Sequence, residues 1–72
     1  MKKEELGRLQ SYLRGVFKMD ALQIRARPQK DDSAEVYIDD EFIGVIYRDD
    51  EDEDLCYNFN MAILEFDLDE MA

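Results

Sequence analysis

The first quarter of the chain carries apolar residues at helical spacing. They recur at intervals of three and four, which places them on one face of an α-helix: Leu6, Leu9, Leu13, Val16 and Phe17. Charged and polar residues occupy the positions between them. The pattern predicts an amphipathic helix over about residues 4–18.

After the helix, the hydrophobic period changes to two, which is typical of half-buried strands. The alternation predicts four strands, at about residues 22–27, 34–39, 41–48 and 55–66, the last of them either bulged or ending near Met61. Pro28 ends the first of them, and Asp39-Asp40 forms a tight turn between the second and third. An acidic loop is predicted over residues 49–54, and the last residues, DLDEMA, are predicted to fray.

This order of elements predicts an α+β fold. Short connections between consecutive strands favour an antiparallel meander, because neighbours in sequence then pair with each other. We expect a two-layer α-β-β-β-β arrangement, with the N-terminal helix packed on a four-stranded antiparallel sheet. The chain is short enough for residues 1–72 to form one small domain.

The turn at Asp39-Asp40 decides which side chains of the third strand face the helix. A two-residue turn places Val36 opposite Ile43 and Tyr37 opposite Phe42. The side chains then facing the helix are Val36, Ile38, Ile43, Val45 and Tyr47. A three-residue turn would exchange the faces of the third strand, and the pattern leaves both possibilities open. In that strand, Gly44 predicts a bulge or room for a neighbouring ring.

In either register, one large apolar set lies on the sheet face that the helix does not cover. With the two-residue turn this set comprises Tyr37, Phe42 and Ile46, joined by Tyr57 and Phe59 of the fourth strand. Large exposed apolar patches are usually covered by another chain, so these five residues form a candidate dimer interface. The alternative is that the C-terminal segment folds over this face with its own apolar side chains, Ile63, Leu64, Phe66 and Leu68.

Composition narrows the cellular setting. A single cysteine, Cys56, cannot form a disulfide within the chain and suits a reducing compartment. The opening MKKEELGRLQ lacks the apolar segment of a secretory leader, and no apolar run approaches the roughly 18 residues of a membrane span. We therefore expect a soluble cytoplasmic protein.

The net charge of −10 is distributed unevenly along the chain. Residues 1–30 contain eight Lys and Arg against three acids, whereas residues 31–72 contain one Arg against sixteen acids. A chain of this overall sign is repelled by nucleic acid and by anionic lipid. We therefore expect neither a nucleic acid nor a membrane as a partner.

The acidic loop is the densest charge cluster, with six consecutive carboxylates: Asp49, Asp50, Glu51, Asp52, Glu53 and Asp54. Asp50 would begin a calcium-binding EF-hand loop, and the alternate acids match its early ligand positions. The required glycine is replaced by Leu55, and the final glutamate by Met61, so no metal site is predicted. We expect the six acids to make electrostatic contacts, either with a basic protein or with the basic helix of a second copy.

Residue types needed for catalysis are largely missing. The chain has no histidine, which is the commonest general base. Ser11 and Ser33 have no base partner, and Cys56 lies near acids that blunt thiol reactivity. No glycine-rich loop is present to hold phosphate. We expect a protein that is not an enzyme and has no cofactor.

Three stretches, RARPQKDDSAEVY, DEFIGVIYRDDEDED and YNFNMAIL, carry a family resemblance. They are similar to a family of short bacterial proteins of unknown function, typical of alphaproteobacteria, over about Leu9 to Asp67. The resemblance implies a one-domain bacterial cytoplasmic protein. It brings no activity, cofactor or site residue.

Two functions fit these observations. The first is a protein-interaction module that self-associates, as a homodimer formed through the sheet face or an edge strand. The second is an acidic decoy that imitates nucleic-acid phosphates and binds a basic protein. Its carboxylate rows would be residues 31–32, 39–41 and 49–54.

Overall fold

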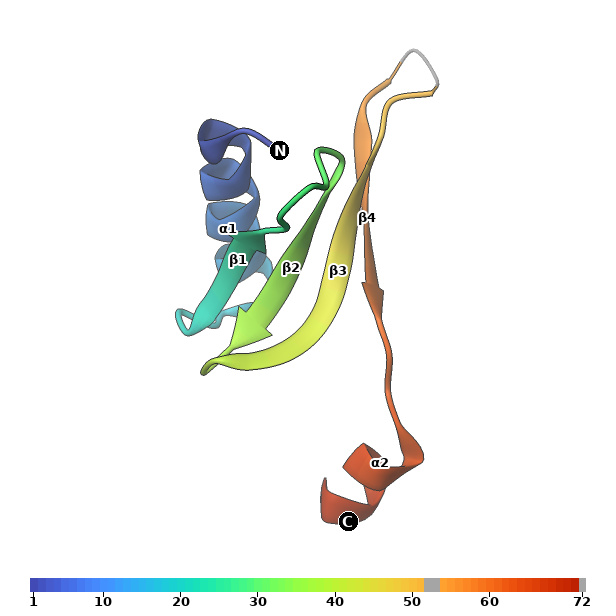
Figure 1. Cartoon of the computed structure of the whole chain (residues 1–72). Helices are drawn as coiled ribbons and strands as arrows, with labels where there is room; N and C mark the ends of the chain where they lie inside the picture. The colour runs from blue at the N-terminus through green and yellow to red at the C-terminus, as the bar shows by residue number, and fades with distance from the viewer. Residues whose placement is uncertain (52–53, 72) are drawn as a thin grey trace.

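The computed structural model describes residues 1–51 and 54–71, with side chains described up to Asp69. The chain forms two helices and four strands (Figure 1). In order, these are α1 (Lys3–Phe17), β1 (Leu22–Ala26), β2 (Ser33–Ile38), β3 (Glu41–Asp49), β4 (Cys56–Met61) and α2 (Glu65–Met71).

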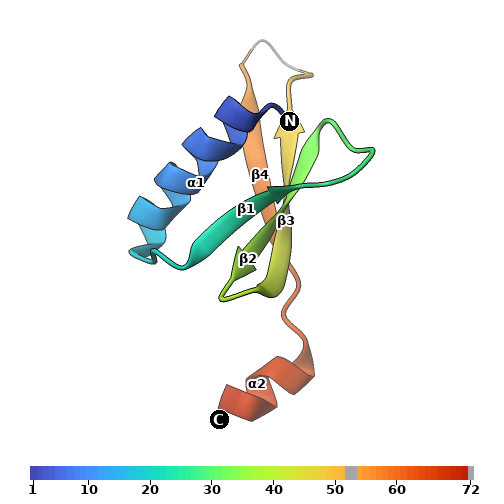
Figure 2. The same cartoon turned by 60° about the vertical axis from the view of Figure 1, so that its left-hand side comes forward.

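The four strands form one antiparallel sheet in the order β1-β2-β3-β4. Helix α1 lies against one face of this sheet, nearest to β1 (Figures 1 and 2). The predicted α+β fold, a helix followed by an antiparallel meander, is therefore confirmed. The additional helix, α2, extends beyond the end of the sheet.

The buried core lies between α1 and the sheet. It is made of Leu22, Ile24, Ala34, Val36 and Ile46, with leucines of α1 packed against them. These leucines are Leu6, Leu9 and Leu13, so the predicted apolar face of the helix does contact the sheet. The helix ends at Lys18, whose backbone is left-handed (φ 53°), and the Met19 N–H donates to the Arg14 carbonyl oxygen at 3.0 Å.

The β2–β3 hairpin closes with a two-residue turn, because Asp39 and Asp40 both have positive φ (52° and 65°). Tyr37 pairs with Phe42 as predicted, but Val36 then pairs with Gly44 rather than with Ile43. Ile43 is an extra residue in β3, and this bulge reverses the alternation of every residue after it.

The bulge makes part of the predicted facing wrong. Ile46, expected on the uncovered face, is only 2% exposed and belongs to the core. Val45 and Tyr47, expected to face the helix, alternate with it and lie on the opposite face. Gly44 allows this arrangement, since a Cβ there would lie 2.4 Å from the Asn60 carbonyl oxygen and 2.7 Å from a Phe59 ring carbon.

The fourth strand takes the shorter of its two predicted extents, not the full 55–66. It ends at Met61, which pairs with Gly44, because the adjacent bulge in β3 ends the ladder there. The predicted frayed tail is also wrong, since Glu65–Met71 forms α2. The Leu64 N–H donates to Asp67 Oδ2 at 3.1 Å, which satisfies a free N–H at the beginning of this helix.

Candidate interaction surfaces

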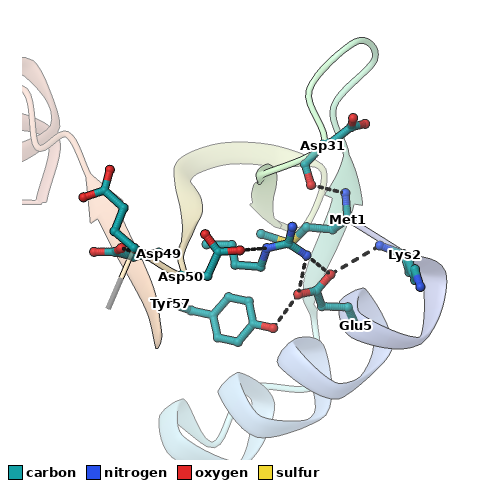
Figure 3. A network of polar contacts seen from close by, with 9 residues as sticks. Met1, Lys2, Glu5, Asp31, Asp49, Asp50 and Tyr57 are labelled. Carbon is teal, nitrogen blue, oxygen red and sulfur yellow. Dashed lines mark hydrogen bonds and ion pairs between the residues drawn. The ribbon is translucent and has the colours of Figure 1, made fainter. Parts of the chain in front are cut away.

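A polar network joins α1 to β3 and β4. Tyr57 of β4 donates its hydroxyl to Glu5 Oε2 at 2.5 Å, and Arg48 of β3 donates Nη1 to both Glu5 oxygens at 3.3 Å (Figure 3). The Lys2 N–H reaches the same carboxylate at 3.4 Å. The Glu5 side chain is only 14% exposed, so one carboxylate fixes the helix to two strands.

The network moves the pKa values of Glu5 and Tyr57 further from neutral pH. The hydrogen bond from Tyr57, followed by Arg48, lowers the pKa of Glu5, while partial burial opposes the shift. The hydrogen bond to Glu5 raises the pKa of Tyr57. Both changes stabilise an ionised Glu5 and a protonated Tyr57, so this pair is not poised for proton transfer near pH 7.

Beside this network lies a groove between α1 and β4, which we call the α1–β4 groove. Its volume is about 470 Å³. Ile46 and Phe59 of the sheet line it, together with Leu9, Arg8 and Tyr12 of the helix. Tyr12 is 67% exposed although it stands beside this apolar surface. The groove is thus apolar, with a cation on its helical wall.

A four-stranded sheet is wider than one helix, which explains why the groove exists. Strands about 4.8 Å apart give a sheet roughly 15–19 Å wide, whereas a helix with its side chains is about 10–12 Å across. Because α1 lies nearest to β1, it leaves the β3–β4 half of the same face only partly covered.

The opposite face of the sheet, which we call the outer face, carries a smaller aromatic cluster. The Tyr37 and Phe42 rings meet edge to face with centroids 5.7 Å apart, and the Arg25 guanidinium lies 4.0 Å from the Tyr37 ring centroid. Phe42 remains 52% exposed. Two of the five predicted interface residues are therefore on this face.

The other three predicted interface residues lie on the α1 side instead. Ile46 is in the core, while Tyr57 and Phe59 pack against it. Phe59 also meets Phe17 of the helix, with ring centroids 6.4 Å apart. Their predicted placement on the uncovered face is wrong because the bulge at Ile43 turns Ile46 to the α1 side, and Phe59, which pairs with Ile46, and Tyr57, two residues before it, lie on that side too.

The segment after β4, residues 62–69, forms what we call the C-terminal arm. Its four large apolar side chains, Ile63, Leu64, Phe66 and Leu68, are 60–66% exposed. Helix α2 makes no extensive contact with any other helix or strand, and both views show it beyond the sheet (Figures 1 and 2). The predicted alternative, in which this segment folds over the outer face, is not the arrangement observed.

Where the arm leaves β4, a second groove of about 720 Å³ opens on the molecule. Phe42, Val45 and Tyr47 of β3 line it on one side, and Leu64 of the arm on the other. Its charged lining residues, Glu41 and Asp67, are both acidic. This groove therefore favours apolar or cationic groups over an acidic occupant.

The two edges of the sheet differ. On β1, the Ile24 N–H donates to Gln10 Oε1 at 3.0 Å, and Arg14 Nε donates to the Leu22 carbonyl oxygen at 2.8 Å. Side chains of α1 thus occupy this edge. Within the described part of the chain, no group outside β3 hydrogen-bonds to the β4 backbone, so the edge of β4 is open.

The acidic cluster straddles the end of β3. Asp49 closes the strand and accepts from the Glu51 N–H at 3.2 Å, and Asp50 lies 3.9 Å from Arg48. Asp54 is exposed, whereas Asp52 and Glu53 lie outside the described residues. No group of three or more potential metal ligands was found in residues 1–51 and 54–71.

Comparison with known proteins places the chain in a family. The family model described as protein of unknown function (DUF3126) matches residues 5–67. The chain belongs to this family. The predicted resemblance to a family of unknown function is thereby confirmed, and its bacterial source stays a prediction. No curated protein and no solved structure matches the chain.

The DUF3126 match covers all or most of each surface described above. It begins at Glu5, the centre of the polar network, and ends at Asp67 within α2. Both walls of the α1–β4 groove therefore lie inside the matched region, as does most of the arm. As for membranes, no helix in the described residues combines the length and apolar character of a membrane span.

Proposed function

We propose that this DUF3126 protein is a non-enzymatic protein-interaction module that self-associates as a homodimer. The observation that carries the proposal is the C-terminal arm, whose four large apolar side chains remain mostly exposed. Burying them is the strongest driving force that the described surface offers.

The size of this driving force favours a symmetric pair. Full burial of a Leu, Ile or Phe side chain contributes about 1.5–3 kcal/mol, so completing the burial of four contributes about 4–8 kcal/mol per arm. Association costs about 4–15 kcal/mol in lost freedom. One buried arm offsets only the lower part of this cost, whereas two arms buried reciprocally contribute about 8–16 kcal/mol, which is comparable with the whole range. A closed two-fold dimer supplies two.

The polar chemistry supports an interaction role over catalysis. The most strongly interacting carboxylate, Glu5, is held ionised by Tyr57 and Arg48 and ties α1 to the sheet. Its role is accounted for by the fold. The acidic-decoy alternative has less support, because residues 39–41 lie at the β2–β3 turn, at the opposite end of these strands from residues 31–32 and 49–51.

Light scattering coupled to size-exclusion chromatography tests the proposal. We expect the average mass to rise from monomer to dimer between low and high micromolar protein. The double variant Phe66→Glu/Leu68→Glu should remain monomeric, since it places charges on the arm. Phe42→Glu, on the outer face, is the matched aromatic control and should associate like the unmodified chain. A strictly monomeric unmodified protein at high micromolar concentration contradicts the proposal.

A further inference from the structure

We infer that the α1–β4 groove binds helix α2 of a second copy of this chain. The inference rests on the proposed self-association and identifies the surface that receives the arm. The groove is the uncovered half of the sheet face next to α1, and a second helix is the element that completes such a layer. Among the described residues, helix α2 makes no extensive contact with another helix or strand.

The apolar surfaces match. The groove presents Leu9, Ile46 and Phe59, and Tyr12 at its rim is 67% exposed. In the arm, Leu64 and Leu68 are each 60% exposed and stand four residues apart, so they share one side of α2, a helix of seven residues that is about 10 Å long. Phe66, 66% exposed, lies on the other side of the helix. A helix of this length places a few apolar side chains in a groove between α1 and β4.

The charges select this groove over the one on the outer face. The sequence of helix α2, EFDLDEM, has four acids and no cation. The outer groove is lined by Glu41 and Asp67, which repel an acidic helix. The α1–β4 groove has Arg8 on its wall, and its own carboxylate, Glu5, already interacts with Arg48 and Tyr57.

A second copy, rather than the same chain, supplies the helix. The connection from Met61 to α2 is three residues, which span at most about 10 Å. In both views α2 lies beyond the end of the sheet, so reaching its own groove would require the arm to reverse. A copy related by a two-fold axis donates its arm and receives the other, with no such reversal.

Complementation between two defective variants tests the inference. The groove variant Arg8→Glu/Tyr12→Glu keeps an intact arm, and the arm variant Phe66→Glu/Leu68→Glu keeps an intact groove. Gln23→Glu, at an exposed position of β1, is the control for added charge. We expect the variants to fold, because Tyr12, Phe66 and Leu68 are more than half exposed and Gln23 is an exposed residue of an edge strand. Circular dichroism of each variant checks this.

We expect each double variant alone to associate at least about tenfold more weakly than the unmodified chain, and Gln23→Glu to associate normally. An equimolar mixture of the two should associate more tightly than either variant alone and more weakly than the unmodified chain, because only one intact arm meets one intact groove; native mass spectrometry at high micromolar concentration detects the heterodimer. If the arm variant is monomeric but the groove variant dimerises normally, the arm binds elsewhere; the inference is then wrong and the self-association stands. If both are monomeric and the mixture at high micromolar concentration associates no more tightly than either variant alone, the inference is also overturned. A monomeric unmodified chain removes the proposed function itself.

Discussion

The hydroxyl of Tyr57 offers the sharpest test of how α1 is held on the sheet. Tyr57→Phe removes a hydrogen bond to Glu5 that spans 52 positions of the chain, while the ring and its packing remain. A hydrogen bond to a charged group contributes about 1.5–3 kcal/mol when well shielded. Glu5 keeps its bonds from Arg48 and Lys2, so we expect a loss of about 1–2 kcal/mol in the free energy of unfolding.

Tyr37→Phe is the matched control. Tyr37 also donates to a glutamate, at 2.9 Å, but Glu35 lies two residues away on the same strand. That hydrogen bond lies within one strand and does not connect two elements, so its loss should lower the free energy of unfolding by about 0.5 kcal/mol or less. Both variants are read by urea unfolding at one protein concentration, preferably in the Phe66→Glu/Leu68→Glu background, so that association does not differ between them.

The expected readout is a lower urea midpoint with an unchanged slope. For a chain of this size, the slope is about 1 kcal/mol per molar urea, so Tyr57→Phe should lower the midpoint by about 1 M or more. Equal midpoints for Tyr57→Phe and Tyr37→Phe would refute the reasoning, since they would mean that linking α1 to β4 adds nothing beyond a surface hydrogen bond.

Two further predictions concern pH and glycine. Because the pKa of Glu5 is lowered from 4.5 and that of Tyr57 is raised from 10.0, their contribution is complete between these two ordinary values. It is lost as pH falls through the lowered pKa of Glu5 or rises through the raised pKa of Tyr57. Urea unfolding of the unmodified chain and of Tyr57→Phe should therefore give free energies of unfolding whose difference narrows at both extremes of pH. A difference that does not depend on pH contradicts this. Gly44→Ala should destabilise the protein by about 1–3 kcal/mol through the clash with Phe59 and Asn60, whereas Gly15→Ala, with open space around it, should stabilise α1 by up to about 1 kcal/mol. Thermal unfolding compares the two, and equal effects would show that the β3–β4 approach is not tight.

The sequence predicts what local patterns determine. The spacing of Leu6, Leu9 and Leu13 predicts α1, and Asp39-Asp40 predicts the two-residue turn, because each depends on residues close in the chain. Gly44 predicts a bulge or a close neighbour without deciding between them, so alternation within β3 alone gives the wrong face for Ile46. One extra residue thereby moves every later side chain of β3 to the opposite face of the sheet from the one predicted.

The network around Glu5 escapes sequence reasoning for a related reason. Its carboxylate meets Arg48 and Tyr57, which are 43 and 52 positions away. In the sequence, Glu5 is an ordinary acid in the first turn of a helix, and Tyr57 an ordinary strand aromatic. Helix α2 escapes because it has only seven residues, too few for a helical period to stand out against the alternation of β4.

The charges around the open edge of β4 bear on which kind of assembly this chain can form. An exposed edge strand that contains no Lys or Pro can pair with a strand of another sheet. The sequence of β4, CYNFNM, contains neither residue. The strand is flanked by acids on both sides: Asp49, Asp50 and Asp54 before it, and Glu65 and Asp67 after it. Antiparallel pairing of two β4 edges would place the acidic loop of one copy beside the acidic arm of the other, and parallel pairing would place loop beside loop. Both arrangements are repulsive, whereas an arm docked beside Arg8 is not. Electrostatics therefore favours a closed exchange of arms over open-ended growth at the sheet edge.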